Sequence, residues 1–162
     1  AEEKQDVLRS LGISETALSN SDHIHISSTG GRVVLVGLKE EKALETLQPD
    51  FSKIEAISNH LNLVGYYVFA KKDSEGDGEP IVTTRMFAPR YAINEEAATG
   101  MAAAALAAYL YDHEQIEDEK FTVEQGKYMN PPSRSLIHVQ VTETQKGVCQ
   151  KLLIGGETSI KE

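Results

Sequence analysis

Residues 97–111 form an unbroken stretch without a charged side chain, and this stretch constrains the fold more than any other. It is dominated by alanine and leucine, which have high intrinsic helix propensity, so it predicts a helix from about Gly100 to Asp112. A helix on a protein surface carries a polar stripe along one face, whereas here no charge interrupts the pattern before Asp112. The helix is therefore expected to be buried on nearly all sides, with the rest of the chain wrapped around it.

The remaining sequence alternates between helical and extended patterns. Apolar residues at helical spacing predict helices over 2–11, 40–47 and 50–62. Extended runs predict strands over 23–27, 32–36, 65–71, 81–88, 121–125, 136–142 and 148–154, with a loop over 73–80. Because strands precede and follow the apolar helix, we predict an α+β fold in which a curved, mostly antiparallel sheet wraps around a central apolar helix. A flat α+β sandwich with helices on one face is the alternative.

Composition narrows the classes of partner. The 162 residues suit a single domain over 1–162, and the net charge of −9 argues against nucleic acid and against an anionic membrane surface. The apolar stretch is too short to span a bilayer, and the acidic, polar start of the sequence does not have the pattern of a signal peptide. Cys149 is the single cysteine and can form no internal disulfide, so we expect a cytoplasmic protein in which this thiol is structural.

The start of the apolar helix is the best candidate for a small-molecule site. Thr99 and Gly100 are favoured residues at a helix N-terminus, where free N–H groups and the positive end of the helix dipole favour an anion. Glu96 stands just before them and is a candidate acid or base. The alternative is that Glu96 only stabilises the helix dipole.

Histidine supplies the other candidate ligands. His23 and His25 are two residues apart on a predicted strand and so share one of its faces. No acid or cysteine at ligand spacing joins them, so we expect a solvated strand face and no metal.

Several motifs together resemble the phenazine-biosynthesis PhzF-like family, which has the diaminopimelate epimerase fold. Residues 85–89 read Arg-Met-Phe-Ala-Pro, and residues 94–102 read Asn-Glu-Glu-Ala-Ala-Thr-Gly-Met-Ala. Leu-Ala-Ala-Tyr-Leu follows at 106–110, then Gln125-Gly126 and Pro132-Ser133. The resemblance implies one of two similar domains, each a curved sheet around a central helix, with the active site between them. It also implies proton transfer on a small carboxylate-bearing metabolite without a metal or cofactor.

The sequence departs from the family pattern at informative places. It resembles the second domain only; Glu96 stands where the family has an aspartate, Met101 where it has a serine, and Pro131 where it has an arginine. The resemblance then implies Glu96 as the catalytic acid or base, with Thr99, Gly100 and Met101 binding substrate. As a half-length chain, the protein would pair with a second copy of itself or with a separate first-domain chain. The alternative is a non-catalytic remnant or subunit that binds a ligand or partner.

Overall fold

The computed structural model describes residues 2–19, 24–72, 79–114, 119–146 and 148–157. In this part of the chain eight strands form one sheet, in which β1, β2, β3, β4, β6, β7 and β8 are successive neighbours and β5 pairs with β4 beside this path. The strands are β1 (Ile24–Ser28), β2 (Arg32–Leu38), β3 (Gly65–Lys71), β4 (Val82–Ala88), β5 (Ile93–Glu96), β6 (Lys120–Gln125), β7 (Ser135–Gln145) and β8 (Val148–Gly155).

Most neighbouring strands are antiparallel, as predicted, and two pairs are parallel. The parallel pairs are β2 with β3 and β4 with β6. A parallel pair needs a crossover between its strands, and helices lie within both of these connections. The curved, mostly antiparallel sheet is therefore confirmed. Its two parallel pairs are possible because a helical connection joins the strands of each pair.

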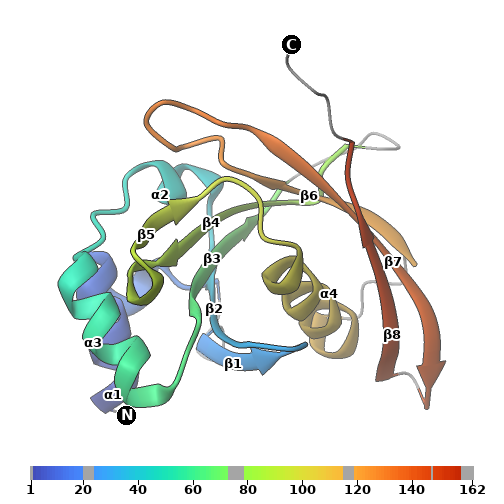
Figure 1. Cartoon of the computed structure of the whole chain (residues 1–162), viewed down its shortest axis with the longest axis horizontal. Coiled ribbons are helices and arrows are strands. Elements are labelled where there is room, and N and C mark those ends of the chain that lie inside the picture. The colour runs from blue at the N-terminus through green and yellow to red at the C-terminus, as the bar shows by residue number, and fades with distance from the viewer. Residues whose placement is uncertain (1, 20–23, 73–78, 115–118, 147, 158–162) are drawn as a thin grey trace.

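The apolar stretch forms α4 (Gly100–Glu114), which lies inside the curl of the sheet between β1 and the β7–β8 pair (Figure 1). Between Gly100 and Asp112 no residue is exposed, and Ala105, Leu106 and Leu110 have no accessible surface. The side chains around α4 come from the inner face of the sheet and include Val33, Phe69, Val123, Ile137 and Val139. The prediction of a helix wrapped by a sheet is thus confirmed, and the flat sandwich is wrong.

Three further helices cover the opposite face of β2, β3 and β4: α1 (Glu2–Leu11), α2 (Glu41–Glu45) and α3 (Phe51–Leu61). The position of β3 between α4 and these outer helices explains why its sequence is almost entirely apolar. Tyr67 and Phe69 face α4, whereas Tyr66 and Val68 face the outer helices, so both faces of the strand are buried.

Some sequence expectations fall on residues that the structure does not describe. His23 and residues 73–78 of the predicted loop lie outside the described residues. None of the helices in the described part of the chain combines the length and apolar character needed to cross a membrane.

Candidate functional site

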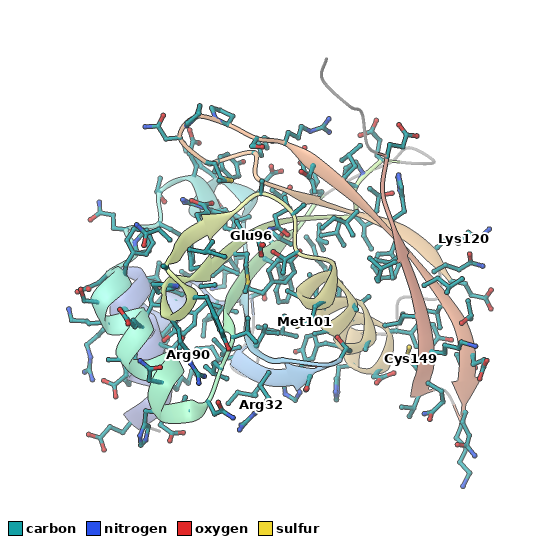
Figure 2. All side chains as sticks on the ribbon, in the orientation of Figure 1. Arg32, Arg90, Glu96, Met101, Lys120 and Cys149 are labelled. Carbon is teal, nitrogen blue, oxygen red and sulfur yellow. The ribbon has the colours of Figure 1, made fainter. Side chains whose placement is uncertain are left out.

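Glu96 ends β5, and α4 begins four residues later (Figure 2). Its side chain is partly exposed, and its Oε2 accepts a hydrogen bond from Thr99 Oγ1 at 2.5 Å. The structure thus brings the predicted acid and the start of the helix together. This arrangement places a carboxylate beside the positive end of the α4 dipole.

Thr99 is already engaged through both of its donors. Its backbone N–H donates to Gln125 Oε1 at 3.1 Å, and its hydroxyl donates to Glu96. Gln125 in turn donates from Nε2 to the Glu96 carbonyl at 2.7 Å and to Thr99 Oγ1 at 3.0 Å. The Q-G motif of the sequence therefore ties β6 to the turn between β5 and α4, a role that the sequence alone did not indicate.

Gly100 and Met101 form the first turn of α4, where backbone N–H groups lack partners within the helix. Within the described residues, no hydrogen bond from the amides of Gly100 or Met101 is present. The Met101 sulfur lies beside Gly31, and its carbonyl accepts from Thr29 Oγ1 at 3.0 Å. The β1–β2 hairpin therefore covers one side of this turn, while Ile154 of β8 packs close to Gly100.

The neighbouring acid, Glu95, has a different environment. Arg85, which is 8% exposed, binds both Glu95 oxygens at 2.8 Å through Nε and Nη2, and its Nη1 donates to the Leu44 carbonyl at 2.8 Å. This two-point contact fixes β5 against β4 and α2. Among the described residues no cation forms an ion pair with Glu96, so the two adjacent acids differ in their pairing: Glu95 is bound by Arg85 and Glu96 is not.

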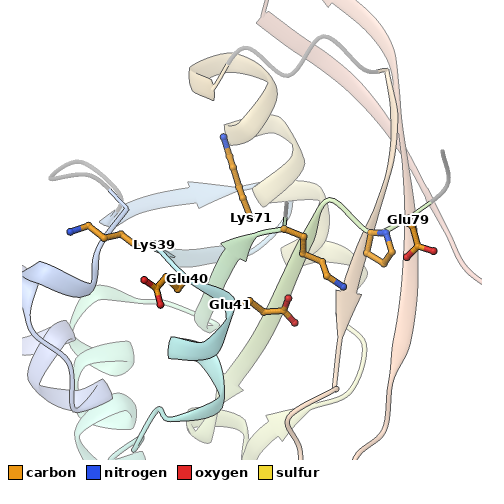
Figure 3. Close-up of a pocket in the computed structure, with 7 residues that line it drawn as sticks. Lys39, Glu40, Glu41, Lys71 and Glu79 are labelled. Atoms are coloured by element: carbon orange, nitrogen blue, oxygen red, sulfur yellow. The ribbon is translucent and has the colours of Figure 1, made fainter. Parts of the chain in front are cut away.

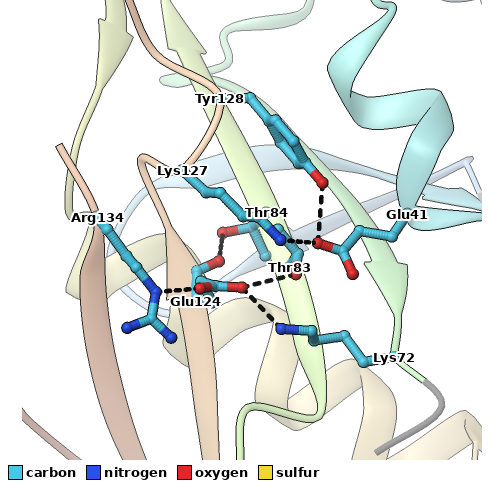
Figure 4. A network of polar contacts seen from close by, with 8 residues as sticks. All are labelled: Glu41, Lys72, Thr83, Thr84, Glu124, Lys127, Tyr128 and Arg134. Carbon is cyan, nitrogen blue, oxygen red and sulfur yellow. Dashed lines mark hydrogen bonds and ion pairs between the residues drawn. The ribbon is translucent and has the colours of Figure 1, made fainter. Parts of the chain in front are cut away.

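A buried carboxylate with two partly exposed cations lies on the outer face of the sheet (Figure 4). Glu124, on β6, accepts from Arg134, from Lys72 at 2.9 Å and from Thr83 at 3.1 Å. Burial by itself raises the pKa of Glu124, but the hydrogen bonds and charges of Arg134 and Lys72 outweigh it and lower the pKa to about 2. This cluster was not predicted from the sequence, because its residues come from separate strands and loops.

Glu41 extends this charged region at the start of α2. It accepts from Lys127 at 2.7 Å and from the Tyr128 hydroxyl at 2.9 Å. Burial opposes ionisation, but these hydrogen bonds leave the pKa of Glu41 below its ordinary value. Both carboxylates are therefore held ionised by partners within the chain.

An open groove of about 520 Å³ adjoins these charges (Figure 3). It is lined by Lys39, Glu40, Glu41, Lys71, Lys72, Glu79 and Pro80. None of residues 96–101 lines it, so the groove and the predicted site are different places. Its lining mixes both signs of charge, which gives it no preference for a carboxylate substrate.

The other candidate groups have structural surroundings. Within the described ranges, no three His, Cys, Asp or Glu side chains are placed to share a metal ion. The His25 ring lies tilted beside the rings of Tyr109 and His113, with ring centroids 5.2 and 5.6 Å away. Partial burial and, after it, the charge of His113 lower the pKa of His25. Burial, with Asp112 nearby, raises the pKa of the Cys149 thiol, which argues against a nucleophilic role.

Two solved structures with a similar fold are proteins of the PhzF family. A Bacillus anthracis phenazine biosynthesis protein of the PhzF family matches with a TM-score of 0.67 and 20% identity, over 94% of this chain and 55% of that one. A PhzF-family protein of Enterococcus faecalis matches with a TM-score of 0.60 and 24% identity, over 85% of this chain and 44% of that one. These likenesses support the fold predicted from the sequence.

Sequence comparison identifies the family. An uncharacterised isomerase of Clostridium acetobutylicum is 35% identical over 86% of this chain and 46% of that protein. The trans-2,3-dihydro-3-hydroxyanthranilate isomerase of Pseudomonas chlororaphis is 36% identical over 79% of this chain and 41% of that protein. The chain thus spans about half the length of the curated relatives it matches. The family profile described as "Phenazine biosynthesis-like protein" matches residues 1–161. The chain therefore belongs to the phenazine biosynthesis-like (PhzC–PhzF) family of isomerase-type proteins.

Proposed function

We propose that this chain forms one half of a cofactor-independent isomerase that moves a proton on a small carboxylate-bearing metabolite. Glu96 is the acid or base. Its carboxylate removes a proton from a carbon next to an electron-withdrawing group, the C–H electron pair is delocalised into the substrate, and the proton is then returned at another carbon. The backbone N–H groups of Gly100 and Met101 bind the substrate carboxylate. The Thr99 N–H does not take part, because it already donates to Gln125.

The observation that carries this proposal is the contrast between Glu95 and Glu96. Both are acids at the end of one strand, yet Arg85 neutralises Glu95, while the only hydrogen bond to the Glu96 side chain from a described residue comes from the neutral hydroxyl of Thr99. A carboxylate that is oriented but not paired with a cation remains free to accept and return a proton. It also lies next to unpaired helix amides, which suit an anionic substrate.

The second half of the site is proposed to come from outside this chain, since the relatives it matches are about twice as long. We propose a homodimer or a complex with a separate first-domain chain, in the cytoplasm. Exposed apolar side chains near the end of β8 support an interface there, since Leu153 is 54% exposed and Ile154, which lies close to Gly100, is 38% exposed. Sedimentation at micromolar concentration tests the homodimer, and a clean monomer contradicts it.

Exchange of substrate protons with solvent deuterium tests the role of Glu96. The probe is trans-2,3-dihydro-3-hydroxyanthranilate, the substrate in the name of the Pseudomonas chlororaphis relative. The chain is assayed alone and together with the separately expressed first domain of that relative. We expect Glu96→Gln to reduce exchange by at least ~100-fold.

The control is Glu55→Gln, because Glu55 is an exposed acid of α3. We expect it to exchange at the unaltered rate. Exchange that survives Glu96→Gln unchanged contradicts the role of Glu96.

Met101 favours a second candidate function, a non-catalytic subunit that binds a ligand or partner. A methionine side chain cannot donate a hydrogen bond, and here it packs beside Gly31. If the chain only binds its ligand, calorimetry detects binding of a small carboxylate to the chain. The chain then supports no proton exchange, either alone or together with a first-domain partner.

A further inference from the structure

Gln125 is the last residue of β6 and has no accessible surface, yet all four of its side-chain hydrogen-bonding positions are used. Oε1 accepts from the Tyr67 hydroxyl at 2.9 Å and from the Thr99 amide at 3.1 Å. Nε2 donates to the Glu96 carbonyl at 2.7 Å and to Thr99 Oγ1 at 3.0 Å. A side-chain amide has two donors and one oxygen able to accept twice, so Gln125 is fully satisfied.

The backbone fixes which way the Gln125 amide points. The Thr99 N–H can only donate and the Glu96 carbonyl can only accept. If Oε1 and Nε2 were exchanged, Nε2 would face the Thr99 N–H, donor against donor, and Oε1 would face the Glu96 carbonyl, acceptor against acceptor. Nε2 therefore donates to the Thr99 hydroxyl oxygen. The single proton of that hydroxyl is then directed to Glu96 Oε2, 2.5 Å away.

Tyr67 fills the second acceptor position of Gln125 Oε1, but the Thr99 amide and the Glu96 carbonyl already fix the direction of the side-chain amide. Thr84 Oγ1 lies 3.1 Å from the Tyr67 hydroxyl, which itself donates to Gln125. Burial, followed by the negative charge of Glu96, raises the pKa of Tyr67, although the hydrogen bond with Thr84 opposes this. The phenol therefore stays protonated and remains a donor to Gln125.

The residue after Gln125 permits the close approach. Gly126 has φ +81°, and a Cβ there would lie 3.1 Å from the Ala97 carbonyl oxygen and 2.0 Å from that of Ser133. Glycine thus lets the end of β6 contact the turn that carries Glu96.

We propose that Gln125 is a positioning residue: it holds the Thr99 hydroxyl as a donor to one oxygen of Glu96 and leaves the other oxygen for the substrate. Within the described residues, no hydrogen bond reaches Glu96 Oε1. Glu96 is partly exposed and ends a short strand, so without this contact its side chain would sample several rotamers. The catalytic consequence rests on the proposed function, whereas the orientation of Glu96 does not.

The orientation is tested without any activity, by three-bond NMR couplings that report the rotamers of Glu96 in the full chain. We expect one dominant rotamer in the wild-type protein and in Tyr67→Phe, which removes one bond to Gln125 but leaves the Thr99 and Glu96 contacts. We expect rotamer averaging in Thr99→Val and in Gln125→Glu, which places a carboxylate oxygen against the Glu96 carbonyl. Averaging in the wild-type protein overturns the proposal, and so does a single unchanged rotamer in folded Thr99→Val.

A double substitution, Gln125→Glu with Thr99→Val, distinguishes positioning of Glu96 by Gln125 from a purely structural role of Gln125. If Gln125 acts through Thr99, Gln125→Glu has no further effect on the Glu96 rotamers in the Thr99→Val background. An added effect of similar size in that background overturns the proposal.

Where the chain supports proton exchange, kcat is expected to fall at least ~10-fold in Gln125→Glu, with KM changed less than ~3-fold, and to stay near wild type in Tyr67→Phe. Equal losses of kcat in Gln125→Glu and Tyr67→Phe overturn the proposal. An ordered Glu96 together with an absence of exchange in every variant contradicts the proposed function alone.

Discussion

Replacing Glu124 by glutamine should destabilise the fold in a strongly pH-dependent way. The Glu124 side chain is 2% exposed and bridges Lys72, which directly follows β3, and Arg134, which directly precedes β7. Although burial opposes it, the pairing lowers the pKa of Glu124 from 4.5 to about 2. At about 1.4 kcal/mol per unit this corresponds to roughly 3 kcal/mol. Because the Arg134 side chain is 53% exposed, water screens part of the contact, and we expect about 2 kcal/mol.

The sign follows from the lowered pKa of Glu124. This stabilisation is complete above the ordinary pKa of 4.5 and is lost as the pH falls through that value toward about 2. Urea denaturation of the wild-type protein and Glu124→Gln should therefore give free energies of unfolding that differ by about 2 kcal/mol at pH 7. The difference should shrink by roughly half near pH 3, where most of the unfolded chains carry a protonated carboxyl.

Glu143 offers a matched control, because its ion pair with Lys151 is exposed. We expect Glu143→Gln to change the free energy of unfolding by less than about 0.5 kcal/mol at both pH values. A Glu124→Gln effect of the same size at pH 7 and pH 3 would refute the reasoning, because the loss would then come from packing and not from charge.

Two further predictions concern α4 and the turn that carries Glu96. Ala105→Leu should cost ~1–3 kcal/mol, measured as a fall in Tm, because Ala105 has no accessible surface; Ala108→Leu, at a partly exposed position of the same helix, should cost less. Gly126→Ala should cost at least ~2 kcal/mol in urea denaturation, because a Cβ there meets backbone atoms; Gly30→Ala, also at positive φ but with nothing within 4 Å, should cost less. Equal losses within either pair contradict the packing argument for that pair.

The central helix and most strands were predictable because the pattern of apolar residues within each segment reflects how that segment is buried. The stretch over 97–111 excludes a surface helix, and the structure places α4 over Gly100–Glu114, two residues beyond the predicted end. Strand β3 was predicted over 65–71 and is found over Gly65–Lys71. A segment that is buried on every side is apolar throughout, so it can be recognised in the sequence without knowing which elements pack against it.

Strand β5 and the Glu124 cluster were not predicted, for a related reason. The Ile-Asn-Glu-Glu sequence of β5 is short and polar, and Arg85 of β4 neutralises Glu95 within it. Likewise, Glu124 is stabilised by Lys72, 52 residues away in the chain. A polar residue becomes compatible with burial only through such distant partners, and local spacing does not identify them. The same limit applies to the site, where Glu96 and Thr99 were singled out but Gln125 was not.

The position of α4 in the chain also affects the order of folding. The helix is apolar on all sides, and strands β7 and β8, which cover part of it, come later in the sequence. During synthesis α4 therefore emerges after β1 to β4 but before β7 and β8, and the part of its apolar surface that β7 and β8 cover stays exposed until residues 135–155 are available. The interval between synthesis of α4 and synthesis of β8 is thus the stage at which this chain is most prone to aggregate or to require a chaperone.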